Sequence, residues 1–204
     1  MLLSPYRFEP PAIVVPAVTL NPAKTDAGLT LSNGNLTVLD FPDMGHRRTF
    51  ATLGYSSGLH YFEIRIDSSN AATNYMCFGI GLASAGAYAN LGDAADTRAL
   101  YQENGNKFYN SVSTPYSVTA GQGNIIGIAL DSTAGKVYFA VNNVWGAGGD
   151  PAAGTIPAYT GVTGVQYPAA SMFNGGSVPR DTLTFRFKAA SFTYSPPVGF
   201  SPWE

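Results

Sequence analysis

The sequence predicts an all-β fold, built as an antiparallel sandwich or barrel of short strands. Short segments alternate apolar and polar residues with the period of two that is typical of a half-buried strand. The 204 residues include 23 glycines and 14 prolines, which keep these segments short. No stretch of about twelve residues free of glycine and proline carries the 3.6-residue period of a helix. A parallel sheet with crossover helices is therefore disfavoured.

Composition excludes several classes of protein. Charged residues make up 12% of the chain, about half the usual share, and this disfavours a helical bundle. Hydrophobic residues reach 45%, so disorder driven by low hydrophobicity is excluded. The formal net charge of −2 argues against a broad binding surface for nucleic acid. No apolar run approaches the roughly 18 residues of a membrane-spanning helix, so no membrane insertion is expected.

The predicted strands begin with a hairpin. Residues 29–32 and 36–38 alternate apolar and polar side chains, and Asn33-Gly34 between them supplies the positive φ angles of a tight turn. The clearest period of two covers residues 60–67. There Phe62, Ile64 and Ile66 point to one face, and Tyr61, Glu63, Arg65 and Asp67 point to the other.

Further strands follow along the chain. Residues 76–82 place Gly79 and Gly81 on one face, which marks a close approach of backbone or of an aromatic ring. Residues 93–103 are expected to hold at most one short helical turn. A second strong hairpin has strands at 125–130 and 137–141 and a turn at 131–135. Two later strands, 167–173 and 183–187, complete the set.

Residues 1–27 differ from the rest and are predicted to form an extended arm before a sandwich domain at 28–204. Each of five prolines there fixes φ and removes a backbone donor: Pro5, Pro10, Pro11, Pro16 and Pro22. The apolar piece 12–15 is unsuited to an unbound linker, so docking on the domain or on a neighbouring subunit is expected, with self-association as a symmetric oligomer. The residues assigned to this assembly arm are Tyr6, Phe8, Ile13, Val14 and Val15.

Redox and targeting signals point to synthesis in a cytoplasm. Cys77 is the single cysteine, so it forms no internal disulfide, and its apolar neighbours predict a small buried side chain. The first residues lack the charged region and the long apolar stretch of a signal peptide.

Catalytic signals are weak, and the chain is not expected to be an enzyme. His46 and His60 are the only candidate bases, and there is no Gly-x-Ser-x-Gly nucleophile motif. Glu63 and Asp67 have the spacing of a glycosidase carboxylate pair, but Arg65 lies between them, so a solvated row of alternating charges is expected. Zinc-ligand spacing and a G-x-G-x-x-G phosphate loop are absent. Loop Asp and Asn residues, for example near Asp150, leave a calcium site open but show no defined ligand spacing, so no metal or cofactor is expected.

Binding of a ligand is the function that remains once catalytic, metal and cofactor signals have been considered. The segments between the strong strands are rich in tyrosine, asparagine, serine and glycine, a composition favoured in binding loops because rigid rings supply contact area and small polar groups supply adaptable hydrogen bonds. The candidate ligand-binding residues are Tyr88, Tyr101, Asn104, Asn106, Lys107, Tyr109, Tyr116, Asn143 and Trp145.

Several motifs resemble those of SPRY (B30.2-like) domains. An early strand motif of the family is matched by Ser57-Gly58 followed by His60-Tyr61-Phe62-Glu63-Ile64. The glycine-containing strand that comes next in the family resembles Phe78-Gly79-Ile80-Gly81. The later hairpin and the last strand motif are similar to Ile126-Gly127-Ile128-Ala129-Leu130-Asp131, Gly135-Lys136-Val137-Tyr138-Phe139 with Asn142, and Tyr167-Pro168-Ala169. The resemblance covers residues 28–200.

A closer resemblance is to SPRY-like domains of bacteriophage tail and other virion proteins. It is carried by Asn33-Gly34-Asn35-Leu36-Thr37, Ala51-Thr52-Leu53-Gly54, Asn104-Gly105-Asn106-Lys107 and the ending 192–200. The resemblance implies a concanavalin A-like β-sandwich of the SPRY-type jelly roll, here behind an extended N-terminal arm. It also implies a non-enzymatic module that binds through loops at one end.

Three functions follow as hypotheses. The leading one is a virion structural protein, associated with a tail, fibre or baseplate, whose loops recognise a host surface glycan or protein. The alternative is a capsid or tail decoration protein that contacts only neighbouring virion subunits. The third is a glycan depolymerase that uses Glu63 and Asp67, and a cellular adaptor domain is the remaining possibility. In the first two, the chain is made in the bacterial host cytoplasm and resides in the virion.

Overall fold

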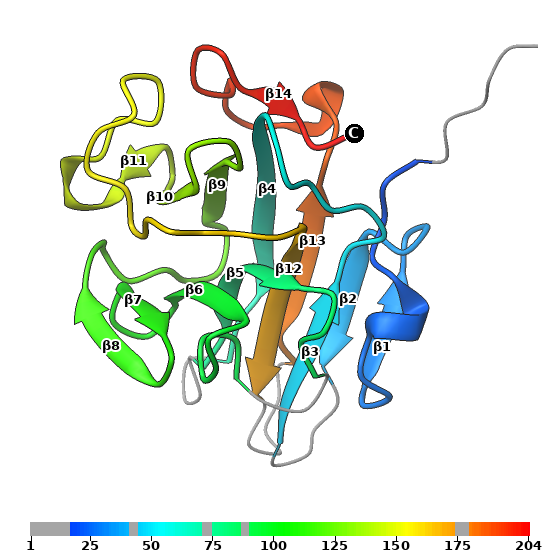
Figure 1. Cartoon of the computed structure of the whole chain (residues 1–204). Coiled ribbons are helices and arrows are strands. Elements are labelled where there is room, and N and C mark those ends of the chain that lie inside the picture. The colour runs from blue at the N-terminus through cyan, green and yellow to red at the C-terminus, as the bar shows by residue number, and fades with distance from the viewer. Residues whose placement is uncertain (1–16, 41–44, 71–74, 87–89, 174–179) are drawn as a thin grey trace, which may run out of the picture.

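Two β-sheets packed face to face form the domain in the computed structural model, which describes residues 17–40, 45–70, 75–86, 90–173 and 180–204 (Figure 1). The larger sheet has the order β1 (Leu29–Ser32), β2 (Thr37–Asp40), β13 (Thr182–Arg186), β4 (Leu59–Ser68), β9 (Ile125–Asp131), β10 (Lys136–Val141) and β11 (Val144–Trp145). The smaller sheet has the order β3 (His46–Phe50), β12 (Gln166–Phe173), β5 (Cys77–Leu82), β6 (Thr97–Tyr101), β7 (Asn106–Tyr109) and β8 (Val112–Pro115).

Neighbouring strands within these two rows run antiparallel, as predicted. A short last strand, β14 (Ser201–Pro202), pairs with β4 in the parallel direction. The only helices among the described residues are single 3₁₀ turns: η1 (Pro22–Lys24), η2 (Gly146–Gly148) and η3 (Ala189–Ser191). The all-β antiparallel sandwich predicted from the sequence is confirmed.

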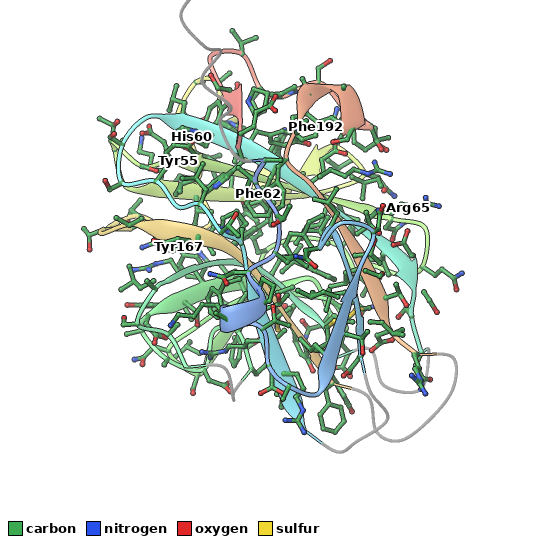
Figure 2. All side chains as sticks on the ribbon, turned by 90° about the vertical axis from the view of Figure 1, so that its right-hand side faces the viewer. Tyr55, His60, Phe62, Arg65, Tyr167 and Phe192 are labelled. Atoms are coloured by element: carbon green, nitrogen blue, oxygen red, sulfur yellow. The ribbon has the colours of Figure 1, made fainter. Side chains whose placement is uncertain are left out.

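The period of two places the core between the sheets. Phe62, Ile64 and Ile66 of β4 are fully buried and belong to the same core cluster as Phe78 and Ile80 of β5. In Figure 2 Phe62 lies in the interior, whereas Arg65 on the opposite face of β4 lies at the edge of the molecule. Removal of these apolar side chains from water supplies the main favourable free energy of folding.

The described part of the predicted arm belongs to the compact domain. Val18 and Leu20 are buried in the core, and Leu20 forms a β-bridge with Ala51. Asn21 caps η1 through a hydrogen bond from the N–H of Ala23, at 2.9 Å. The compact domain therefore includes residues 18–27, ahead of the predicted boundary at residue 28.

Two local predictions need correction. The first hairpin turn takes four residues, Asn33 to Leu36, because Ser32 pairs with Thr37. The positive φ predicted for Asn33 and Gly34 is confirmed, and Asn35 has positive φ as well. Residues 93–103 contain strand β6, which the expectation of at most a helical turn missed. Two later hairpins do use the two-residue turn with positive φ at both positions, at Asn110-Ser111 and Asn142-Asn143.

Candidate functional site

Two cations and three tyrosines converge beside β6 and β7. We call the group the tyrosine–cation surface, which consists of Arg98, Lys107, Tyr109, Tyr116 and Tyr159. The guanidinium carbon of Arg98 lies 4.6 Å from the centre of the Tyr109 ring. The Nζ of Lys107 lies 5.1 Å from the centre of the Tyr159 ring and 5.8 Å from that of Tyr116. These distances are those of cation–π contacts.

Strand pairing brings these side chains to one side of the smaller sheet. Leu100 of β6 belongs to the core between the sheets, and Arg98, two residues before it, points to the same side. Lys107 pairs with Leu100 across the β6–β7 ladder, so Lys107 and Tyr109 share that side as well. In Figure 1 β7 and β8 form the outer end of this sheet, below the loop drawn in yellow.

That loop supplies the opposite wall of the surface. The Nζ of Lys107 donates a hydrogen bond to the carbonyl oxygen of Ala158, at 2.7 Å. The rings of Tyr109 and Tyr159 are 5.6 Å apart. Tyr116 packs on Gly146, where a Cβ atom would lie 2.2 Å from the ring, so η2 and the end of β8 are in close contact. The surface thus joins segments that are up to about sixty residues apart in the chain.

The surface is positively charged and carries neutral phenols. Burial raises the pKa of Tyr116 to about 12. Burial also raises the pKa of Tyr159, and this effect outweighs the opposite effect of the nearby Arg98. None of the ion pairs among the described residues involves Arg98 or Lys107. Among the described residues the site therefore presents two cations and tyrosine rings with no acid paired to them, while the hydroxyl of Tyr116 is sealed from solvent and has no hydrogen-bond partner.

The structure brings together three of the nine predicted ligand-binding residues, namely Lys107, Tyr109 and Tyr116. Tyr101 lies on the other side of the smaller sheet, where it packs against Phe108. The ring of Trp145 lies 6.4 Å from that of Tyr61, on the outer side of the larger sheet. These two aromatic residues do not join the surface.

The predicted asparagines have local structural roles. The side chain of Asn104 accepts a hydrogen bond from the N–H of Asn106, and Asn106 donates to the Oγ of Ser113, both at 2.9 Å. Asn143 occupies a hairpin turn with φ of 64°. Tyr88 and the arm residues Tyr6, Phe8, Ile13, Val14 and Val15 lie outside the described residues.

Sequence reasoning missed Arg98 and Tyr159. Arg98 belongs to strand β6, which was not recognised because its residues, Thr97-Arg98-Ala99-Leu100-Tyr101, show no clear contrast between apolar and polar faces. Tyr159 lies in an irregular loop where periodicity carries no signal. Tertiary pairing alone places both residues in the site.

Glu63 is not part of a solvated row of charges, as was expected. Its side chain is fully buried beneath the segment that follows β13. Oε1 accepts hydrogen bonds from the Tyr194 N–H at 2.8 Å and the Tyr61 hydroxyl at 3.1 Å, and Oε2 accepts from the Thr193 N–H at 2.7 Å and from Arg186 at 3.3 Å. Both oxygens are thus engaged in holding the C-terminal segment.

Asp67 and Arg65 do form the expected exposed charge pair, with 3.4 Å between Arg65 Nε and Asp67 Oδ1. Asp67 also accepts a hydrogen bond from the hydroxyl of Thr184 on β13. A glycosidase needs two carboxylates that reach a sugar from either side. Glu63 is sealed from solvent, so the pair named for the depolymerase hypothesis does not present this geometry.

The other residues considered for chemistry are packed. Cys77 is fully buried, and burial raises the pKa of its thiol. His60 stacks on Tyr55 with 3.6 Å between ring centres, as Figure 2 shows, and burial lowers its pKa. His46 lies on β3 against Phe173, and burial lowers its pKa as well.

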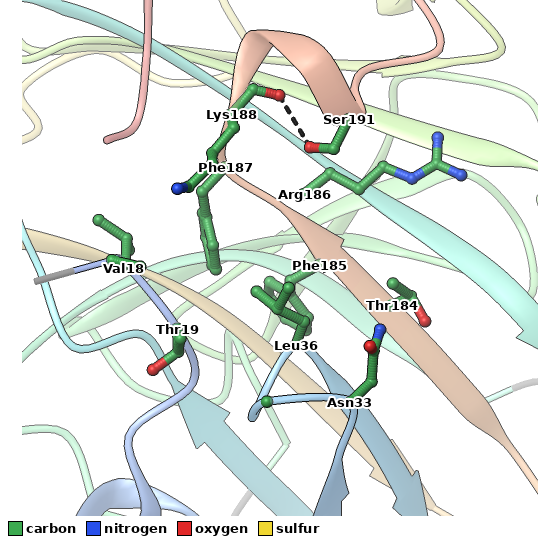
Figure 3. Close-up of a pocket in the computed structure, with 12 residues that line it drawn as sticks. Val18, Thr19, Asn33, Leu36, Thr184, Phe185, Arg186, Phe187, Lys188 and Ser191 are labelled. Atoms are coloured by element: carbon green, nitrogen blue, oxygen red, sulfur yellow. Dashed lines mark hydrogen bonds between the residues drawn. The ribbon is translucent and has the colours of Figure 1, made fainter.

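An apolar cavity of about 450 Å³ lies between the β1–β2 turn, β13 and the start of the described chain (Figure 3). Val18, Leu36, Phe185 and Phe187 line it, and the hydroxyl of Ser191 donates to the carbonyl of Lys188 at its rim, at 2.8 Å. Its lining is apolar, so it suits an apolar side chain better than a sugar or a nucleotide.

Asp181, just before β13, is a buried carboxylate away from the tyrosine–cation surface. Its Oδ1 accepts a hydrogen bond from the N–H of Asn70 at 2.7 Å, and its Oδ2 has no hydrogen-bond partner among the described residues. Burial raises the pKa of this carboxyl to about 6, although the Asn70 N–H acts in the opposite direction.

Replacing Asp181 with asparagine is expected to remove a pH-dependent part of the free energy of unfolding. The folded protein binds this proton more tightly than the unfolded chain, whose pKa is 3.8. The stability that the group contributes is therefore complete below about pH 4 and is lost as the pH rises through about 6, by at most about 3 kcal/mol. Urea unfolding across this range should show the variant more stable at neutral pH, with the gap closing in acid. A difference that is independent of pH would contradict this.

Among the described residues, no three His, Cys, Asp or Glu side chains form a group that could hold a metal ion. No helix within the described ranges has the length and apolar character needed to cross a membrane.

The fold and the surface define the class, a two-sheet antiparallel β-sandwich with an aromatic and cationic surface at one end of its smaller sheet. The family model described as "SPRY domain" matches residues 59–175, more than half of the chain. The chain therefore belongs to the SPRY domain family.

Several known proteins match the chain over most of its length. The SPRY domain of human HERC1 superposes with a TM-score of 0.65 at 19% identity and covers 82% of this chain and 96% of that one. Stonustoxin superposes with a TM-score of 0.57 at 22% identity, over 82% of this chain and 26% of the toxin chain. In sequence, the chain is 28% identical over 159 residues to the E3 ubiquitin-protein ligase TRIM9 of Drosophila melanogaster, and it spans 20% of that protein's length.

Proposed function

We propose that this chain is a non-catalytic recognition module that binds a protein partner through the tyrosine–cation surface. The observation that carries the proposal is the convergence of Arg98, Lys107 and three tyrosines, with no acid of the described chain to neutralise them. Tyrosine and arginine are the residues that most often dominate binding energy at protein interfaces. Membership of the SPRY family agrees with this role.

Apolar residues at the rim favour a protein over a glycan. Val112 lies directly opposite Tyr109 in the β7–β8 hairpin and is 60% exposed. Ile156, two residues before Ala158, is 55% exposed and has φ of 48°, a strained conformation for a β-branched residue. Aliphatic side chains beside the rings suit the apolar groups of a peptide or protein surface.

Replacing Tyr109 with alanine is expected to weaken partner binding by about thirty-fold or more, the size of an interface hot spot. Random twelve-residue peptides displayed on yeast serve as the probe, because the natural partner is not specified. The complete wild-type chain should enrich a peptide family, whose dissociation constants are then measured for both proteins by fluorescence anisotropy.

The control is Tyr194→Ala, because Tyr194 is a half-buried tyrosine on the C-terminal segment over the larger sheet. This variant should bind the enriched peptides like the wild type. Enrichment of no peptide, or equal loss with both variants, would overturn the proposed function. Binding only to an array of glycans would favour glycan recognition instead.

The setting that we propose is a virion, in which this recognition serves attachment to a host surface. The support is the set of virion-like motifs, such as Asn104-Gly105-Asn106-Lys107, together with the proline-rich arm. In this proposal the arm docks on other virion proteins or on a second copy of the chain. The second candidate function is decoration of a capsid or tail. Mass spectrometry of purified virions would detect the chain whether it serves attachment or decoration. Its absence from particles would favour a cellular adaptor.

A further inference from the structure

Arg98 is a buried cation that lacks a counter-ion among the described residues. Only 8% of the residue is exposed, and its guanidinium makes no hydrogen bond or ion pair with the described chain. Its known contact is the ring of Tyr109. The guanidinium nitrogens keep some contact with solvent, because none of them is among the side-chain atoms that are sealed from solvent without a partner.

The other largely buried arginines have partners within the domain, apart from the Nε of Arg48, which is buried without one. Arg47 pairs with Asp26 at 2.8 Å, and Arg186 pairs with Glu63 at 3.3 Å. Arg48 donates to the carbonyl oxygens of Gly86 and Asn90. Because a buried charge is costly unless it is paired, the domain follows the general rule at Arg47 and Arg186, follows it in part at Arg48, and departs from it at Arg98.

The geometry leaves the donors of Arg98 available. The guanidinium carbon lies 4.6 Å from the centre of the Tyr109 ring, and none of the five N–H donors of the guanidinium makes a hydrogen bond with the described chain. Lys107 is already bonded to the carbonyl of Ala158, so it contributes positive potential to the site. Arg98 is then the group that can form a bidentate pair with a carboxylate.

We propose that Arg98 is a subsite for a carboxylate of the protein partner, supplied by an acidic side chain. The tyrosines bind the surrounding peptide, and the carboxylate neutralises the guanidinium charge of Arg98, which has no counter-ion in the described domain. This inference rests on the proposed function, because it assigns the chemistry of the ligand at the same surface. It adds one specific contact, between Arg98 and an acidic residue of the partner, and this contact is tested separately from peptide binding as a whole.

The test is a double-mutant cycle on the complete chain. Peptides are selected by the wild type from two yeast-displayed libraries of random twelve-residue sequences, one with all amino acids and one without aspartate and glutamate. The first library should be enriched in sequences with a shared acidic position. Changing that residue to its amide, or Arg98 to glutamine, should each weaken binding about ten- to hundred-fold, and the two changes together should cost little more than either alone.

Controls separate the subsite from a structural role of Arg98. Because the buried guanidinium has no hydrogen-bond or ion-pair partner in the described domain to offset its desolvation, Arg98→Gln should melt at the wild-type temperature or above it, despite loss of the contact with the Tyr109 ring. If Arg98→Gln fails to fold, Arg98→Lys keeps the charge without the planar fork and should still weaken the acidic peptide about ten-fold. A neutral peptide that ends in an unblocked carboxylate tests whether a chain terminus can replace the side chain.

The results of this test separate failure of the Arg98 subsite from failure of the proposed function. If peptides are enriched but the cycle is additive, the Arg98 subsite is overturned while the recognition module stands. Equal enrichment from the acid-free library has the same consequence. If neither library yields a binder, the proposed function and the subsite both fall. If only acidic glycans bind, and Arg98→Gln abolishes their binding, the assignment to a protein carboxylate is overturned.

Discussion

Replacing Glu63 with glutamine is expected to destabilise the domain by about 3 kcal/mol, a large part of the stability of a domain of this size. The two carboxylate oxygens accept four hydrogen bonds, two of them from the backbone of Thr193 and Tyr194. An amide supplies one oxygen, and its NH₂ group would face an N–H donor. The variant would also leave Arg186 without its charge partner.

Asp67→Asn is the matched control for this prediction. Asp67 lies four residues further along the same strand, and its side chain is 27% exposed, so loss of its charge should cost less than about 1 kcal/mol. Guanidinium unfolding measures both variants, and hydrogen exchange should show faster exchange of residues 188–200 in Glu63→Gln. Equal destabilisation by the two substitutions would contradict the role assigned to Glu63.

The strand pattern could be predicted from the sequence where each strand has one face in the core. β4, β9 and β10 alternate or run apolar as their burial requires, and all three were predicted. The strands at the outer end of the smaller sheet were harder, because β7 is only half-buried throughout and β8, the edge strand, is exposed throughout, so neither has a face that must be apolar. Burial of Glu63 was not foreseeable from β4 itself, since the covering segment lies about 130 residues away.

The candidate site was predictable only in part, for a related reason. Composition singled out the segment that contains Lys107, Tyr109 and Tyr116, because tyrosine and small polar residues cluster there. It could not say which side of the sheet each ring takes, so Tyr101 was included although it faces away from the surface. Nor could it supply Tyr159, which reaches the site through the contact of its loop with Lys107.

The close approach predicted for the glycine face of β5 is confirmed. It also gives the second substitution with a large expected effect on stability. Gly79 and Gly81 were expected to mark a close approach of backbone or of a ring. A Cβ atom on Gly79 would lie 1.9 Å from the carbonyl oxygen of Arg98, and one on Gly81 would lie 2.9 Å from the ring of Phe50. Both kinds of contact are therefore present on the one strand.

Gly79→Ala is accordingly expected to destabilise the domain by about 3 kcal/mol or more, because the atom that it meets is backbone in a paired strand and cannot rotate away. The strand that must shift is β6, which carries Arg98, so the variant should also weaken peptide binding. Gly121→Ala is the control, since a Cβ there meets nothing within 4 Å, and its unfolding free energy should stay within about 0.5 kcal/mol of the wild type. Urea unfolding distinguishes the two, and a Gly79→Ala protein as stable as Gly121→Ala would show that β6 can move without cost.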